Sequence, residues 1–221
     1  MINFMKINNI LKYIGENNSR YKNYKGIGEI DENNLRQGEW KQYWGNGKLK
    51  RKGTYVNGYR DGYLEQYYFN GVIELKGKYL KGKREGYWED YYENGKLFSK
   101  GNYKNGIYDG YWEFYFDNGI LLSKGTYING KQDGYWEEYW SNGYIYSKGN
   151  YVNNKRDGYW EYYYSDGKLW KKGNCVNGIR DGYWEHHYSN GKLESKGTYV
   201  NCKYYEDNIF KRIKLFFIRF M

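Results

Sequence analysis

Aromatic, apolar and polar residues recur along the chain in a fixed order with a period of 24 residues. Each unit follows the pattern GYWExYYxNGKLxSKGxYVNGxRD, in which runs rich in Tyr, Trp, Val and Thr alternate with short Asn-Gly segments. Aromatic and β-branched residues favour strands, and Asn-Gly between two such runs is typical of a tight hairpin turn. The pattern therefore predicts two strands in every unit. The seven units occupy residues 38–61, 62–85, 86–109, 110–133, 134–157, 158–181 and 182–205.

Consecutive hairpins predict an all-β fold, an elongated and twisted single-layer antiparallel meander. Leu, Ile and Val are scarce whereas the chain contains 32 Tyr and 9 Trp, so we expect no thick aliphatic core. The side chains of neighbouring hairpins must instead pack against one another along the sheet. Tyrosine suits this role because its ring packs while its hydroxyl stays in water. The third residue of each unit is expected to form the main row, from Trp40 to Trp184, with Leu64 in the second unit.

The turns also predict how the strands pair. A two-residue type I′ turn at Asn94-Gly95 places Tyr92 opposite Leu97 and Trp88 opposite Gly101, where the indole covers bare backbone. On the other side of the sheet, oppositely charged residues then face each other, which supports this alignment, although each pair contributes only about 0.2–1 kcal/mol. The predicted pairs are Glu65–Lys76, Glu89–Lys100, Glu113–Lys124, Glu137–Lys148, Glu161–Lys172 and Glu185–Lys196.

The repeats divide the chain into three parts, residues 1–37, 38–205 and 206–221. A short helix is predicted near the start of the first part, and a partial repeat (GEIDENNLRQ, 28–37) at its end. The last part contains NIFKRIKLFFIRFM, with apolar residues at roughly helical spacing among basic ones. It is expected either to cap the open edge of the last hairpin or to lie as an amphipathic helix on a membrane surface. A decayed reading frame is a third interpretation, because the seventh unit departs most from the pattern.

The formal net charge of +10 raises the question of an anionic partner. Within the repeats the densest basic stretch is KLKRK at 48–52, where strand alternation places Lys48, Lys50 and Lys52 on one face. Nucleic-acid binding through base stacking is disfavoured, because the aromatic rings are committed to packing against each other. The candidate contacts to an anionic surface are Lys48, Lys50, Arg51, Lys52, Lys211, Arg212, Lys214 and Arg219.

No pattern typical of catalytic, cofactor-binding or metal-ligating residues is found, so we predict no enzyme. His186 and His187 lack further ligands at suitable spacing, and Cys175 and Cys202 occupy different positions of their units, so a disulfide is not expected. The acidic residue that ends most units recurs evenly, unlike a catalytic pair, and is expected to bond to backbone or to the neighbouring strand. Two cysteines and the lack of a signal-peptide pattern predict a cytoplasmic location, with peripheral attachment to a membrane as the alternative.

The pattern G-x-W-x-x-Y followed by N-G-K-L, K-G-x-Y and a second N-G resembles MORN repeats, in the variant found in antitoxin-like and viral repeat proteins. The resemblance covers residues 38–205. Departures include Leu64 for Trp, Asn154 for Gly and Cys175 for Tyr, and in the seventh unit Cys202 for a turn glycine. The resemblance implies an elongated sheet of β-hairpins that serves as a scaffold or interaction surface, in some proteins near membranes, without shared catalytic residues.

Three functions are compared on this basis. A non-catalytic repeat scaffold that binds another protein is favoured, with the identity of the partner open and self-association through the open sheet ends as one form of it. Association with a membrane surface through the basic tail and the repeats is the alternative. An aromatic cage for a glycan or choline, as in cell-wall-binding repeats, is less favoured because those units are shorter and belong to exported proteins.

Overall fold

In the computed structural model, residues 3–7, 10–16 and 25–207 are described, and all their regular secondary structure is β. The chain divides into two compact units. Unit 1 consists of Met1–Leu121 and Tyr127–Gly130, and unit 2 of Leu122–Thr126 and Lys131–Met221. Strand β11 (Leu121–Ile128) contributes residues to both.

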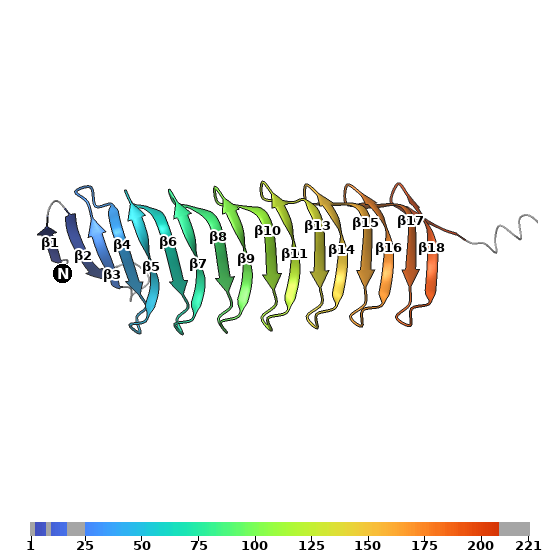
Figure 1. Cartoon of the computed structure of the whole chain (residues 1–221), viewed down its shortest axis with the longest axis horizontal. Helices are drawn as coiled ribbons and strands as arrows, with labels where there is room; N and C mark the ends of the chain where they lie inside the picture. The colour runs from blue at the N-terminus through green and yellow to red at the C-terminus, as the bar shows by residue number, and fades with distance from the viewer. Residues whose placement is uncertain (1–2, 8–9, 17–24, 208–221) are drawn as a thin grey trace, which may run out of the picture. The chain divides into compact units, whose positions relative to one another are not determined.

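In unit 1, consecutive strands from β1 to β10 pair antiparallel with each other (Figure 1). The strands are β1 (Asn3–Ile7), β2 (Ile10–Glu16), β3 (Lys25–Ile30), β4 (Arg36–Tyr43), β5 (Leu49–Val56), β6 (Tyr59–Tyr67), β7 (Ile73–Leu80), β8 (Lys83–Tyr91), β9 (Leu97–Lys104) and β10 (Ile107–Tyr115).

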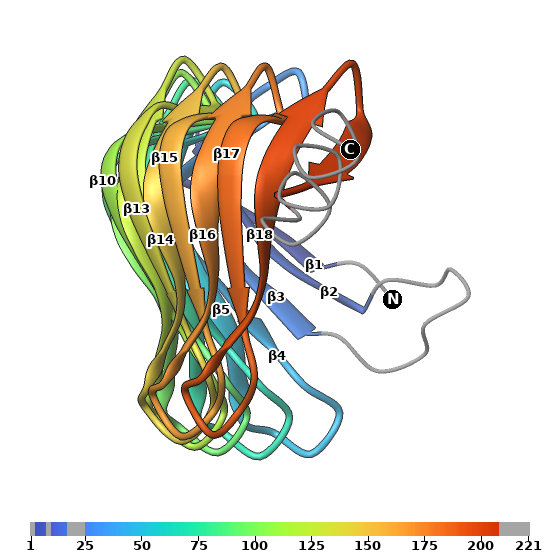
Figure 2. The same cartoon turned by 90° about the vertical axis from the view of Figure 1, so that its right-hand side faces the viewer.

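Unit 2 continues with the same order of pairing, from the β11 residues that face β13 up to β19. Its strands β13 to β18 lie in one layer (Figure 2). The all-β, single-layer antiparallel meander predicted from the sequence is thus confirmed in each unit. The further strands are β12 (Lys131–Gln132), β13 (Gly134–Tyr139), β14 (Ile145–Val152), β15 (Lys155–Tyr163), β16 (Leu169–Val176), β17 (Ile179–His187), β18 (Leu193–Val200) and β19 (Lys203–Glu206).

The helix predicted near the amino terminus is wrong for the residues that the structure describes. Strands β1 and β2 form a hairpin, and β2 pairs with β3 from Leu11 opposite Ile30 to Glu16 opposite Lys25. An edge strand presents a row of unpaired N–H and C=O groups, and pairing with a further strand satisfies them. The helix predicted for the carboxyl-terminal tail lies outside the described residues.

The two turns of each repeat have different geometries. In the second turn of every repeat, both central residues have positive φ, as a type I′ turn requires, and this part of the prediction is confirmed. In the first turns only the glycine does. At Asn94-Gly95 the N–H of Gly95 donates to Tyr92 O (2.9 Å) and the N–H of Tyr92 donates to Lys96 O (2.8 Å). This is a three-residue loop, a type I turn followed by a left-handed glycine.

The longer first turn corrects one predicted pair. Trp88 lies opposite Gly101 and Glu89 opposite Lys100, as predicted, but Leu97 faces Tyr91 instead of Tyr92. The three-residue loop places Tyr92 opposite Lys96, and Phe98 forms a bulge in β9 between Leu97 and Ser99. Asparagine still suits this turn, because Asn94 Oδ1 accepts a hydrogen bond from the Lys96 N–H at 2.9 Å.

The second turn of the seventh repeat keeps its type I′ form although cysteine replaces glycine. Asn201 and Cys202 have φ of 49° and 64°. A side chain in the left-handed region costs roughly 1–2 kcal/mol, which glycine avoids while losing more chain entropy. We therefore expect Cys202→Gly to increase the free energy of unfolding by up to about 1 kcal/mol, measured in urea. Cys202→Ser is the control; an equal gain in that variant would show that the thiol, not the backbone, is responsible.

Candidate interaction surface

Strand alternation gives each unit two different faces. One, here called the tryptophan face, carries the third residue of each repeat, and these side chains are at most 3% exposed. In unit 1 they are Trp40, Leu64, Trp88 and Trp112, and in unit 2 Trp136, Trp160 and Trp184. The opposite face, here called the tyrosine face, carries the residues on either side of each of them.

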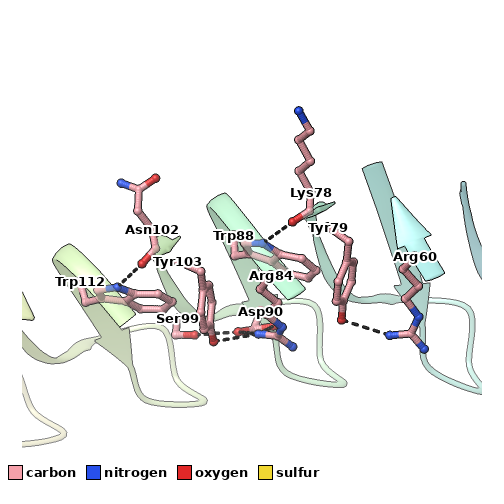
Figure 3. Close-up of polar contacts among 10 residues, drawn as sticks. All are labelled: Arg60, Lys78, Tyr79, Arg84, Trp88, Asp90, Ser99, Asn102, Tyr103 and Trp112. Atoms are coloured by element: carbon pink, nitrogen blue, oxygen red, sulfur yellow. Dashed lines mark hydrogen bonds and ion pairs between the residues drawn. The ribbon is translucent and has the colours of Figure 1, made fainter. Parts of the chain in front are cut away.

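On the tryptophan face, each indole packs on the preceding repeat. Trp88 lies against Gly77 of β7, and its indole N–H donates to Lys78 O at 3.1 Å (Figure 3). From the sequence, this indole was expected to cover Gly101, its partner in the hairpin. A bulge between Gly77 and Lys78 leaves the Lys78 carbonyl free to accept the indole proton, and Trp112 covers Gly101 in turn.

Polar side chains connect neighbouring repeats on the same face. Arg84 donates to the Tyr103 hydroxyl at 2.9 Å and lies 3.4 Å from an Asp90 carboxylate oxygen, which also accepts a hydrogen bond from Ser99 (Figure 3). Arg60 donates to the Tyr79 hydroxyl in the same way, at 3.1 Å. Burial raises the pKa of Asp90 above its usual value despite the neighbouring Arg84. These polar groups are therefore satisfied within their own hairpin or by the adjacent repeat.

The tyrosine face carries a ladder of lysine, glutamate and tyrosine. Lys76 lies 2.6 Å from Glu89, Tyr91 donates its hydroxyl proton to the same carboxylate at 2.6 Å, and the Lys76 ammonium is 5.4 Å from the Tyr91 ring centroid. Partial burial alone would raise the pKa of Glu89, but the hydrogen bonds from Lys76 and Tyr91 lower it.

These contacts refine the predicted charge pairs. The predicted register is confirmed for the pairs whose two residues belong to the same compact unit, such as Glu89 opposite Lys100. The ion contact, however, is made to the lysine of the preceding hairpin, so that Glu89 binds Lys76 while Lys100 binds Glu113 at 2.6 Å. Both lysines lie in register with Glu89, and the Tyr91 ring next to Lys76 favours that ammonium.

An exposed tyrosine row runs along this ladder in each unit. The second residue of the repeat is 51–53% exposed at Tyr63, Tyr87 and Tyr111 in unit 1, and 43–52% exposed at Tyr135, Tyr159 and Tyr183 in unit 2. Strand spacing places successive members about 10 Å apart, because two strands of about 4.8 Å separate them. Tyr87 and Tyr183 each donate to the glutamate two residues on, at 3.3 Å. The rings of Tyr87 and Tyr183 are therefore anchored at the hydroxyl while one side remains in water.

The four basic candidates in the described part of the chain each make a separate contact. The Lys48 ammonium donates to Asn70 O at 2.6 Å, Lys50 lies 4.3 Å from the Trp44 ring centroid, and Lys52 lies 2.8 Å from Glu65. Arg51 is half-buried on the tryptophan face beside Tyr55. The other four, Lys211, Arg212, Lys214 and Arg219, lie outside the described residues.

The remaining candidate groups are the two cysteines, possible metal ligands and the acidic residue that ends most repeats. Cys175 is buried, Cys202 is exposed, and the two do not form a disulfide. Within residues 3–7, 10–16 and 25–207, no cluster of three or more His, Cys, Asp or Glu side chains could hold a metal ion. Asp133 and Asp157 accept hydrogen bonds from backbone N–H groups of the following second turn, at 3.2 Å each, which confirms the backbone role predicted for this position.

No helix in the part of the chain that the structure describes is long and apolar enough to cross a membrane.

Hairpins joined in one layer, with an indole of each repeat lying on a glycine of the repeat before it, define a β-hairpin repeat protein. Six segments match the family model described as MORN repeat variant, and together they cover more than half of the chain. The chain therefore belongs to the MORN repeat variant family, which confirms the resemblance found in the sequence. The matched residues are 36–57, 84–105, 108–129, 132–153, 156–177 and 180–201.

The matched segments omit the repeat in which Leu64 replaces tryptophan. MORN repeats are generally non-enzymatic and are consistent with a repeat scaffold. No curated protein matches the chain.

Proposed function

We propose that this chain is a non-catalytic, cytoplasmic scaffold that binds another protein through the tyrosine face of its repeats. The observation that carries the proposal is the exposed tyrosine row, which recurs at the same position of successive hairpins with nearly constant exposure. These rings contribute little to the packed tryptophan face, so packing alone does not require an aromatic residue at this position.

The chemistry of the row suits a protein partner. Tyrosine offers a large contact area at a low cost in side-chain entropy, and it is enriched among the residues that dominate binding energy in protein interfaces. The hydrogen bonds from Tyr87 to Glu89 and from Tyr183 to Glu185 hold the rings in place before binding. Preorganisation of this kind reduces the entropy lost on association.

The test is a pull-down from cells that contain this protein, with soluble and membrane fractions kept apart. The test variant combines Tyr135→Thr, Tyr159→Thr and Tyr183→Thr. We expect the wild type to retain a stoichiometric protein from the soluble fraction and the variant to lose it. Threonine keeps strand propensity, so thermal unfolding should change little, within about 0.5 kcal/mol for each exposed site.

The matched control combines Tyr144→Thr and Tyr188→Thr, which removes tyrosines of similar exposure (53% and 50%) from the first turns. This control should retain the partner. If the triple variant retains the partner as well as the wild type does, the tyrosine row is not the binding surface. Recovery of the wild type with membranes alone would instead favour association with a lipid surface.

A further inference from the structure

The sixth repeat departs from the others at two neighbouring positions of the tryptophan face. Cys175 stands where every other repeat has a tyrosine, and Lys171 stands where four others have serine. Both side chains are buried, with Lys171 9% and Cys175 3% exposed. The tyrosines that Cys175 replaces are Tyr55, Tyr79, Tyr103, Tyr127, Tyr151 and Tyr199.

Three cations gather at this place in unit 2. The Lys171 ammonium is 4.6 Å from the centroid of the Tyr162 ring, and the Arg156 guanidinium is 5.4 Å from the same centroid. The Arg180 guanidinium lies 4.8 Å from the Trp184 ring, which stacks beside Tyr162 at 6.2 Å. Strand β16 places Cys175 directly opposite Arg180. These three cations are called the β16 cluster below.

One cation of the β16 cluster, Arg156, lacks the acceptor that the equivalent arginine has in other repeats. Arg60, Arg84 and Arg180 each donate to a tyrosine hydroxyl that lies 19 residues further along the chain. For Arg156 that position is Cys175, which has no hydroxyl. The loss of this tyrosine therefore removes the acceptor that the arginine has elsewhere.

Carboxylates are also scarce around the cluster. Lys171 faces Tyr162 on one side and His186 on the other, whereas Ser99 in the third repeat faces Asp90. Among the described residues, the cluster has one carboxylate in ion contact, Glu138, which lies 4.0 Å from Arg156. Among groups in ion contact, three cations and one carboxylate leave an excess of two positive charges, while Asp157 near Cys175 and Glu194 near His186 act at longer range.

The electrostatics agree with this count. Burial, together with Arg180 and Arg156, lowers the pKa of Lys171 from 10.5 to about 8. Burial, with Arg180 and Lys171 nearby, also lowers the pKa of His186. Burial is the largest cause of both shifts, and the neighbouring cations act in the same direction because each further proton is repelled.

The first repeat shows what such a cluster does to a group placed within it. Arg51 occupies the position of Lys171, and Arg36 and Arg60 occupy those of Arg156 and Arg180, but here Tyr55 is present. Burial raises the pKa of this phenol, yet the three arginines outweigh that effect and lower it. In the first repeat the three arginines therefore stabilise negative charge on an oxygen. At Cys175 the cluster's cations act in the same direction, although burial outweighs them and raises the pKa of the thiol.

We propose that the β16 cluster binds a compact dianionic oxyanion of the phosphate class, free or carried by a larger molecule. A dianion balances the excess of two positive charges. Guanidinium groups donate charge-assisted hydrogen bonds to phosphate oxygens, and lysine acts as a point charge for the same group. The site lies on the tryptophan face and does not depend on protein binding by the tyrosine face.

The first experiment titrates the full chain with inorganic phosphate by calorimetry, with chloride at equal ionic strength as the reference. Lys171→Ser installs the residue found in four other repeats and should weaken binding by about tenfold or more, as expected for the loss of a charged partner. Lys172→Ser is the matched control. It removes the same charge one residue away, on the tyrosine face, where Lys172 pairs with Glu185 at 3.1 Å. Lys171→Met serves if the serine variant does not fold.

A second arm identifies the source of the phosphate group through co-sedimentation with phosphatidylcholine vesicles, with and without phosphatidic acid. Phosphate binding in solution that is lost in Lys171→Ser but kept in Lys172→Ser supports a free anion. Sedimentation that depends on phosphatidic acid and on Lys171 supports a lipid headgroup. The proposal is overturned if phosphate acts no differently from chloride and phosphatidic acid has no effect. It is equally overturned if both lysine variants behave alike in both arms.

Discussion

Trp136→Ala is expected to destabilise unit 2 by about 3–5 kcal/mol, the usual range for removing a buried tryptophan. The Trp136 side chain is 1% exposed, and its ring lies against Gly125. Its indole N–H donates to Thr126 O at 3.1 Å, so the substitution also removes one of two hydrogen bonds to that carbonyl, the other coming from the Asp133 N–H at 2.9 Å. The loss should appear as a lower urea midpoint with an unchanged slope.

Trp170→Ala is the matched comparison, since it removes the same side chain from the same unit. Trp170 is only half-buried, with its ring 6.0 Å from that of Tyr164 and 3.8 Å from the Lys171 ammonium. We expect a cost of about 1–2 kcal/mol, because part of the ring is already in water. Equal losses in the two variants would mean that the tryptophan row does not dominate the stability of the repeats.

Gly101→Ala should be nearly as damaging in unit 1, although it adds only one methyl group. A Cβ atom at Gly101 would come within 2.3 Å of Trp112 Cδ2, on a ring that is fully buried. The ring cannot move aside without losing its packing and its hydrogen bond to Asn102 O at 2.9 Å. We expect a loss of about 3 kcal/mol or more in urea unfolding.

Gly191→Ala separates this steric effect from the conformational freedom of glycine. Gly191 has a φ of 84° and no atom within 4 Å of the place where a Cβ would lie. Alanine there should cost about 1–2 kcal/mol through backbone strain alone. If Gly101→Ala costs no more than this control, the indole does not require bare backbone beneath it.

The repeat period was sufficient to predict the strands, the meander and most of the register, because each of these follows from alternation and turn spacing. The alignment of Trp88 with Gly101 follows from counting residues along both strands from the turn that joins them, and it was predicted correctly. The geometry of the first turn, at Asn94-Gly95, was not predicted correctly. Asn-Gly is compatible with a two-residue type I′ turn and with a three-residue turn that ends in a left-handed glycine. Local sequence does not decide between them, and the sheet adopts the second.

The site was harder to predict, because it depends on which neighbour a side chain approaches. Register places Glu89 between two lysines, and only the position of the Tyr91 ring distinguishes them. KLKRK is continuous in the sequence, yet Arg51 and Lys52 lie on opposite faces, with Lys52 bound to Glu65. The β16 cluster joins residues from three strands, and its signal was available in the two departures, Lys171 and Cys175, from the consensus.

In the two units alike, the tryptophan of one repeat rests on a glycine of the repeat before it. Within each unit, the next repeat therefore covers the backbone that one repeat leaves exposed, and the junctions share one arrangement apart from the departures at Leu64 and Cys175. A gene encoding such a chain can gain or lose whole 24-residue modules without creating a new kind of contact. Each repeat gained within a unit would lengthen the tyrosine row by about 10 Å, so that the number of repeats encoded by the gene sets the length of this surface.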